Sequence, residues 1–108
     1  MTERDERMRK LIGQLTAEFL SKNSNRASLI TVTNTVLSPD RKNATVLITV
    51  LPEREEEKAL QFAKRKRSEI RSYLHEHAKF PFLPLLDINI DKGEKNRQRI
   101  DELSRNSE

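Results

Sequence analysis

Four consecutive cations interrupt a helical pattern of apolar residues in the second half of the chain. Residues 59–77 place apolar side chains at the spacing of one helix face, but Lys66 and Arg67 stand where the next apolar residue is due. A continuous helix would point at least one of these two side chains at the core. We therefore expect the helix to stop or bend near residue 67 or 68.

Such a bend would create a binding site for anions. The second half of the helix would begin with free backbone amides, which attract anions, and Ser68 could cap them. Between residues 58 and 79 seven Lys or Arg accompany two Glu, an excess larger than the net charge of +4 of the whole chain. Cations gathered in this way bind phosphates by releasing their counterions, although an ordinary solvated helix face is the alternative. The predicted binding residues are Lys64, Arg65, Lys66, Arg67, Ser68 and Arg71, with Arg41 and Lys42 as a second basic pair.

Residues that would support catalysis or hold a metal are missing or badly placed. The chain has no Cys, and its two glycines are too few for a nucleotide-binding loop. His75 and His77 are two residues apart, which on a helix turns them about 200° from each other and prevents a shared metal ion. No Ser or Thr has a His and an acid in a recognisable nucleophile setting. We expect neither an enzyme nor a cofactor.

The overall composition favours a small intracellular protein with an anionic partner. A chain of 108 residues builds one domain with a modest core, and a pI near 9.6 favours nucleic acid or an anionic surface. No apolar run approaches the roughly 20 residues of a membrane span, and the N-terminus is too charged for a signal peptide. Without cysteines the chain suits a reducing compartment. We expect a cytoplasmic protein that does not bind membranes, and a monomer.

The elements that position the basic run alternate between helical and strand patterns. Apolar residues at helical spacing predict a first helix at about residues 3–22, capped by Thr2. "SLITVTNTVL" and "NATVLITVL" alternate with period two and predict two strands, with Ile30, Val32 and Val36 on one face of the first. "SPDRKN" between them favours a turn, which makes the strands an antiparallel hairpin with Arg41 and Lys42 near its tip.

A third strand follows the broken helix. "LLDINI" alternates again after a linker that contains Pro81 and Pro84. The order helix, strand, strand, broken helix, strand predicts a two-layer α+β domain with helices on one face of a three-stranded sheet. We place this domain at residues 1–92. The tail, residues 93–108, has Ile100 and Leu103 as its apolar anchors and is expected to be flexible or only partly helical.

The hairpin and the tail resemble those of a bacterial protein family. "LITVTNTVLSPDRKNATVLITVL" is similar to the hairpin of ribosome-binding factor A, in which a Val- and Thr-rich strand leads through Ser-Pro-Asp to a basic turn. "KGEKNRQRIDELS" is similar to that family's ending, where a glycine precedes Arg-Ile-Asp-x-Leu, here residues 99–103. The resemblance covers nearly the whole chain.

The resemblance implies a KH-like domain of type II topology. In this family a helix-kink-helix with an Ala-x-Gly element replaces the usual Gly-x-x-Gly loop, and Lys66, Arg67 and Ser68 stand at that element here. The resemblance also implies partners and a role. The family binds the immature 30S subunit, contacts 16S rRNA, and assists 16S rRNA processing and subunit maturation, notably in the cold, without catalysing a reaction.

Two other functions stay open at the level of sequence. One is a KH-like nucleic-acid-binding domain unconnected with ribosomes. The other is a protein-interaction module that uses the threonine-rich sheet face or an edge strand.

Overall fold

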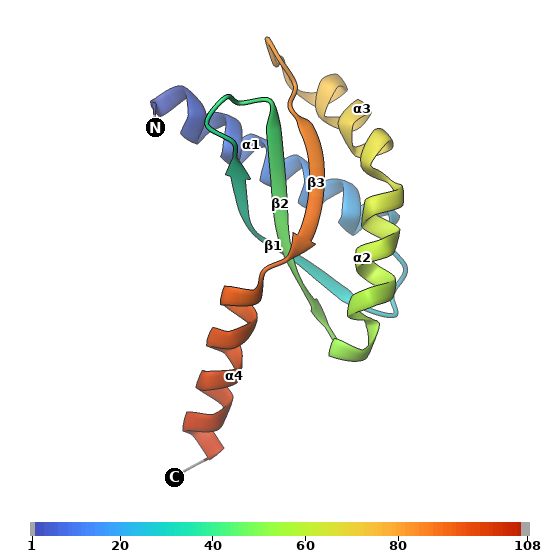
Figure 1. Ribbon diagram of the computed structural model, residues 1–108. Helices are drawn as coiled ribbons and strands as arrows, with labels where there is room; N and C mark the ends of the chain where they lie inside the picture. The colour runs from blue at the N-terminus through green and yellow to red at the C-terminus, as the bar shows by residue number, and fades with distance from the viewer. Residues whose placement is uncertain (1, 107–108) are drawn as a thin grey trace.

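Three strands form one sheet, and the helices that precede the third strand pack against one face of the sheet (Figure 1). This computed structural model describes residues 2–106. The elements in chain order are α1 (Glu3–Asn23), β1 (Leu29–Leu37), β2 (Asn43–Leu51), the 3-10 turn η1 (Glu53–Glu55), α2 (Glu56–Arg65), α3 (Arg67–His77), β3 (Leu85–Ile90) and α4 (Lys92–Asn106). The predicted α+β order is confirmed.

The sheet has the order β1-β2-β3 and is mixed. The hairpin strands β1 and β2 pair antiparallel, with Ile30 opposite Val50, whereas β2 and β3 pair parallel, with Val46 opposite Ile88. A parallel pair needs a crossover connection, because the chain must return to the end of the sheet where the first strand began. The helices α2 and α3 form that connection.

The core lies between the helices and the inner face of the sheet. Val46, Ile48 and Ile88 line that face and are fully buried, as are Ile12 of α1 and Leu74 of α3. Along β2 and β3 these residues alternate with outward-facing ones, as the period-two pattern predicted. The N-terminus of α1 begins with the expected Thr2 cap, whose side chain accepts the Asp5 N–H while the Asp5 carboxylate accepts the Thr2 N–H.

The predicted inward face of β1 is wrong in its second half. The pairing with β2 shifts between Val32 and Asn34, where β1 carries one extra residue. Such a bulge moves every later side chain to the opposite face, so Thr35 is buried and Val36 is 47% exposed. In α1, a Cβ on Gly13 would lie 2.9 Å from Thr35 Oγ1, so this close approach of helix and strand requires glycine.

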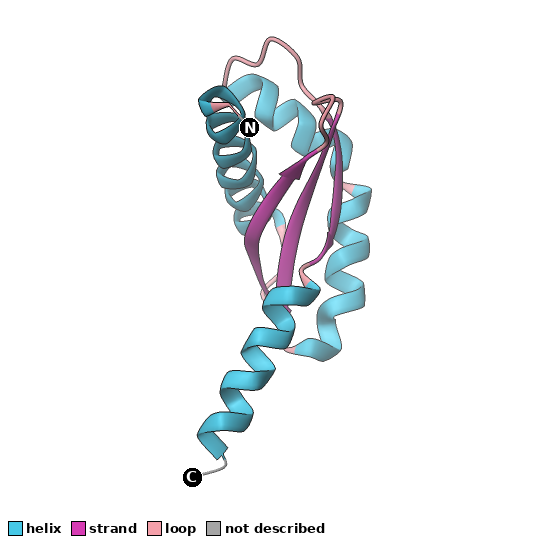
Figure 2. Cartoon of the chain, turned by 60° about the vertical axis from the view of Figure 1, so that its left-hand side comes forward, coloured by secondary structure: helices cyan, strands magenta, loops and turns pink. Residues whose placement is uncertain are grey.

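The C-terminal segment is more helical than the sequence led us to expect. It forms α4, which extends beyond the end of the sheet in both views (Figures 1 and 2). Lys95 pairs with Glu53 at 2.7 Å and with Glu56 at 3.0 Å, and Arg99 pairs with Glu53 at 2.7 Å. The expected apolar anchor Ile100 is 62% exposed, and Leu103 lies outside the residues whose side chains the structure describes. Among the side chains that the structure describes, charged rather than apolar groups therefore hold α4.

The helix α4 also depends on a polar cap that reaches back to the hairpin. Asp91 accepts the Glu94 N–H at 3.0 Å with one carboxylate oxygen and the Thr33 hydroxyl with the other. Thr33 stands at the bulge of β1, so the irregular point of the first strand positions the start of the last helix.

Within residues 2–106 no helix combines the length and the apolar character that a bilayer crossing requires.

Candidate nucleic-acid interface

The helix break lies one residue before the predicted position. The helix before the break, α2, ends at Arg65, and the helix after it, α3, starts at Arg67. Lys66 between them leaves the helical conformation, with φ −93° and ψ 7°. Ala63 and Ile70 on either side of the break are both fully buried. The break therefore lets the apolar face continue from one helix to the next while Lys66 and Arg67 stay out of the core.

The capping role expected of Ser68 is wrong. Lys66 occupies the N-cap position of α3, and no side chain caps this helix. Instead the Lys66 carbonyl accepts the Ile70 N–H at 2.8 Å, and the Ser68 side chain is exposed. Whether Ser68 contacts RNA stays a prediction.

Two of the four cations turn toward β3 and meet at one carboxylate. Lys64 Nζ donates to Asp87 Oδ1 at 2.9 Å and to Asn89 Oδ1 at 3.2 Å, and Arg67 Nη1 donates to the same Asp87 oxygen at 3.2 Å. Burial raises the pKa of Asp87, but the hydrogen bonds from Lys64 and from the Ile88 N–H, with the charges of Lys64 and Arg67, outweigh it. The pKa of Asp87 therefore lies below its usual value, and the carboxylate partly neutralises the predicted site.

The other two cations of the run differ from this pair. Lys66 forms an exposed ion pair with Glu69 at 3.4 Å, within the first turn of α3. Arg65 is exposed and has neither an ion pair nor a side-chain hydrogen bond to any residue that the structure describes. Of the four, Arg65 is thus the cation most available to an anionic partner.

Arg71 has a local structural role. Its guanidinium donates to the Leu83 carbonyl at 2.7 Å and to the Pro84 carbonyl at 3.2 Å. Both acceptors belong to the proline-containing linker before β3. Arg71 therefore holds the linker against α3, and much of its donor capacity is already used.

The second basic pair lies at the turn between β1 and β2. Arg41 adopts a positive φ of 63° and binds Asp5 of α1 through two contacts, 2.7 Å from Nε to Oδ1 and 3.2 Å from Nη2 to Oδ2. Burial raises the pKa of Asp5, but the hydrogen bond from the Thr2 N–H and the charge of Arg41 outweigh this effect. The pKa of Asp5 therefore lies below its usual value. Lys42 is exposed, and its carbonyl accepts the Leu85 N–H at 2.9 Å.

The strand β3 connects the two basic groups. Lys42 is bonded to Leu85 at the start of the strand, and Lys64 and Arg67 reach Asp87, two residues or about 7 Å further along. The alternating pattern of β3 predicted that Asp87 faces outward, but it held no sign that α2 lies beside it. Asp87 and Asn89 are the site residues that sequence reasoning missed.

Comparisons with known proteins agree with the fold. A family model described as "Ribosome-binding factor A" matches residues 4–104. The crystal structure of ribosome-binding factor A from Thermus thermophilus is similar with a TM-score of 0.69 and 22% identity, over 79% of this chain and 93% of that chain. A Thermotoga maritima protein solved by NMR is similar with a TM-score of 0.65 and 18% identity, over 78% of this chain and 83% of that chain.

A third similar structure comes from a ribosomal complex. It is the homology model of the Thermus thermophilus factor as fitted into the cryo-EM map of a complex with 30S, with a TM-score of 0.66 and 23% identity, over 75% of this chain and 88% of that chain. A search of the curated proteins gives no match.

Proposed function

Because this chain belongs to the ribosome-binding factor A family, we propose that it binds the immature 30S subunit through 16S rRNA, with the cations at the helix break as the contact surface. A relative of the same fold has been fitted into a complex with 30S, which supports the choice of partner. The protein would act as a cytoplasmic monomer that assists 16S rRNA processing and subunit maturation, notably in the cold, by stabilising one arrangement of the RNA rather than by catalysis.

The observation that carries this proposal is the division of charges at the break. Arg65 is exposed and available, and Arg67 is about half exposed, at 48%, in its pair with Asp87. An ion pair with this much exposure contributes roughly 0–1 kcal/mol, so a phosphate can replace Asp87 at little cost. The break therefore presents cations that RNA phosphates can recruit without any change in the sheet.

Charge reversal at the break tests the proposal. We expect Arg65→Glu combined with Arg67→Glu to weaken cosedimentation with immature 30S particles by about tenfold or more, because at least two phosphate contacts become repulsive. A matched control is Arg4→Glu combined with Arg7→Glu, which changes the charge equally at exposed positions of α1. Circular dichroism of both double variants checks that the domain is folded.

Two outcomes would contradict the proposal. If both double variants lose binding equally, net charge rather than the break governs association. If neither loses binding, the break is not the contact surface. Sequencing the RNA that copurifies with the protein from cells then separates a ribosomal partner, recovered as 16S precursor, from a KH-like domain that binds other nucleic acids.

A further inference from the structure

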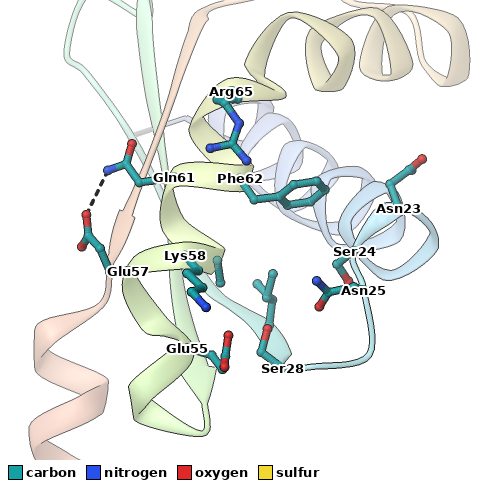
Figure 3. A pocket seen from close by; sticks show the side chains of 12 residues that line it. Asn23, Ser24, Asn25, Ser28, Glu55, Glu57, Lys58, Gln61, Phe62 and Arg65 are labelled. Atoms are coloured by element: carbon teal, nitrogen blue, oxygen red, sulfur yellow. Dashed lines mark hydrogen bonds between the residues drawn. The ribbon is translucent and has the colours of Figure 1, made fainter.

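A hollow of about 510 Å³ opens between α2 and the C-terminal end of α1 (Figure 3). Its volume falls within the range of about 300–1,000 Å³ that is common for small-ligand sites. One wall is formed by Glu55, the N-cap residue of α2, and by Lys58, Phe62 and Arg65 of α2, spaced three, four and three residues apart as neighbours on a helix are. The loop after α1 forms the opposite wall, with Asn25 and Ser28.

The hollow lies on a different side of α2 from the contact with Asp87. Figure 3 shows Arg65 above Phe62, and Gln61 beside Glu57 on the side of α2 away from Asn25; all four of these α2 residues line the hollow. The Gln61 amide donates to the Glu57 carboxylate at 3.1 Å, so this carboxylate already has a hydrogen-bond donor within α2. The basic run thus divides, with Lys64 and Arg67 toward β3 and Arg65 toward the hollow.

The groups along the hollow differ in chemistry from one end to the other. Arg65 provides a guanidinium at one end, and Glu55 provides a carboxylate at the other; the helical rise puts their backbones about 15 Å apart. Phe62 lies between them as an aromatic surface that is only partly buried. Across the hollow, Asn25 Oδ1 accepts the Ala27 N–H at 3.0 Å, which leaves the Asn25 NH₂ group to donate.

We propose that this hollow binds one guanine nucleotide of single-stranded RNA. The base packs on Phe62, its N1–H and N2–H donate to Glu55, and the adjoining phosphate binds Arg65. Unpaired bases are commonly recognised in this way, by stacking on an aromatic side chain and by hydrogen bonds to the base edge. Guanine is the base with two adjacent N–H donors on its pairing edge, the arrangement that a carboxylate accepts.

This inference rests on the proposed function for the choice of RNA as the ligand. Arg65 belongs to both sites, because it stands next to the break at Lys66 and borders the hollow. An RNA strand that follows the cations of the break therefore passes the hollow, where one base can leave the strand and enter. The inference adds a preference for one base to an interface that would otherwise bind phosphates alone.

The test compares two five-nucleotide RNAs, UUGUU and UUAUU, by fluorescence anisotropy. We expect the wild-type protein to bind the guanine oligonucleotide about tenfold more tightly, as is typical of a two-hydrogen-bond contact to a base edge. Glu55→Gln should abolish this preference, so that the variant binds UUGUU and UUAUU with equal affinity. The Glu55 side chain makes no capping hydrogen bond, so the variant should fold normally.

Glu57→Gln is the matched control, because it removes the same charge from a second carboxylate of the hollow, one that already accepts a hydrogen bond from Gln61, and should keep the preference. In NMR titrations with UUGUU, the amides of Asn25 and Phe62 should shift more than with UUAUU. Equal affinity of the wild-type protein for the two oligonucleotides, no measurable binding of either, or an unchanged preference in Glu55→Gln would each overturn the inference.

Failure of the inference is distinguishable from failure of the proposed function. Cosedimentation with 30S particles without any guanine preference would leave the proposed function standing and remove the guanine site. A guanine preference without cosedimentation would leave the guanine site standing and remove the proposed function.

Discussion

Asp87 determines how much of the basic charge at the break is available to a partner. Lys64 and Arg67 both donate to this carboxylate, and its lowered pKa keeps it ionised at neutral pH. The carboxylate holds the two side chains in place, and it also repels any phosphate that approaches them. A residue of the sheet therefore limits how strongly the break can attract an anionic partner.

Replacing Asp87 should strengthen non-specific RNA binding. We expect Asp87→Asn to raise the affinity for a poly-uridine RNA by about two- to fivefold, which is what the loss of an exposed ion pair of roughly 0.5–1 kcal/mol allows. Fluorescence anisotropy at one fixed salt concentration measures the change. Asp101→Asn alters the net charge equally at an exposed position of α4, and an equal gain in that variant would show that position does not matter.

At the scale of elements, the side chains described for α4 dock this helix through ion pairs. Its ion pairs join Lys95 and Arg99 to Glu53 and Glu56. The Lys95 hydrogen bond, with the charges of Lys95 and Arg99, lowers the pKa of Glu53, and the Glu53 and Glu56 hydrogen bonds raise the pKa of Lys95. The docked position of α4 therefore favours ionised Glu53.

Acid should release α4 from the domain. Because the pKa of Glu53 is lower when α4 is docked, the contribution of Glu53 is complete above its ordinary value of 4.5 and is lost as the pH falls through the lower value. The NMR shift of the Lys95 amide, followed from pH 7 downward, reports the release. Glu53→Gln should shift that amide already at neutral pH, whereas Glu57→Gln should not; an unchanged Glu53→Gln spectrum would contradict this account of docking.

The elements also show what the sequence could and could not predict. The helix break was predictable because a continuous helix would bury a cation, a conflict visible in the spacing of Ala63, Lys66 and Ile70. The bulge of β1 was missed because an extra residue leaves the period-two pattern intact on each side of it. The docking of α4 was missed because its anchors are ion pairs between residues 39 or more positions apart, which no local pattern reveals.

At the scale of the whole molecule, the chain is elongated. Its extents are 51 × 32 × 17 Å, and its radius of gyration is 14.9 Å, against about 13 Å for a globular chain of this size. The projection of α4 accounts for this shape (Figure 1). A flat, basic molecule of this kind offers a large surface to an extended anion relative to its mass.

The salt dependence of binding should identify the class of partner. If RNA neutralises three to five cations, the logarithm of the affinity should fall with the logarithm of salt concentration with a slope of roughly −2 to −4. The Arg65 and Arg67 double reversal should make this slope shallower. A nearly flat slope for the natural partner would instead favour a protein that binds the uncovered sheet face, where Thr31 and Asn89 are exposed.

The parallel pairing of β2 and β3 has a consequence for how this surface can change over evolution. The chain must travel back along the sheet between Leu51 and Leu85, and the break at Lys66 lies near the middle of that return path. The strand registers are set by the hairpin and by the β2–β3 ladder, neither of which includes the junction. Residues at the junction can therefore be exchanged, and recognition altered, while the scaffold that carries them is inherited unchanged.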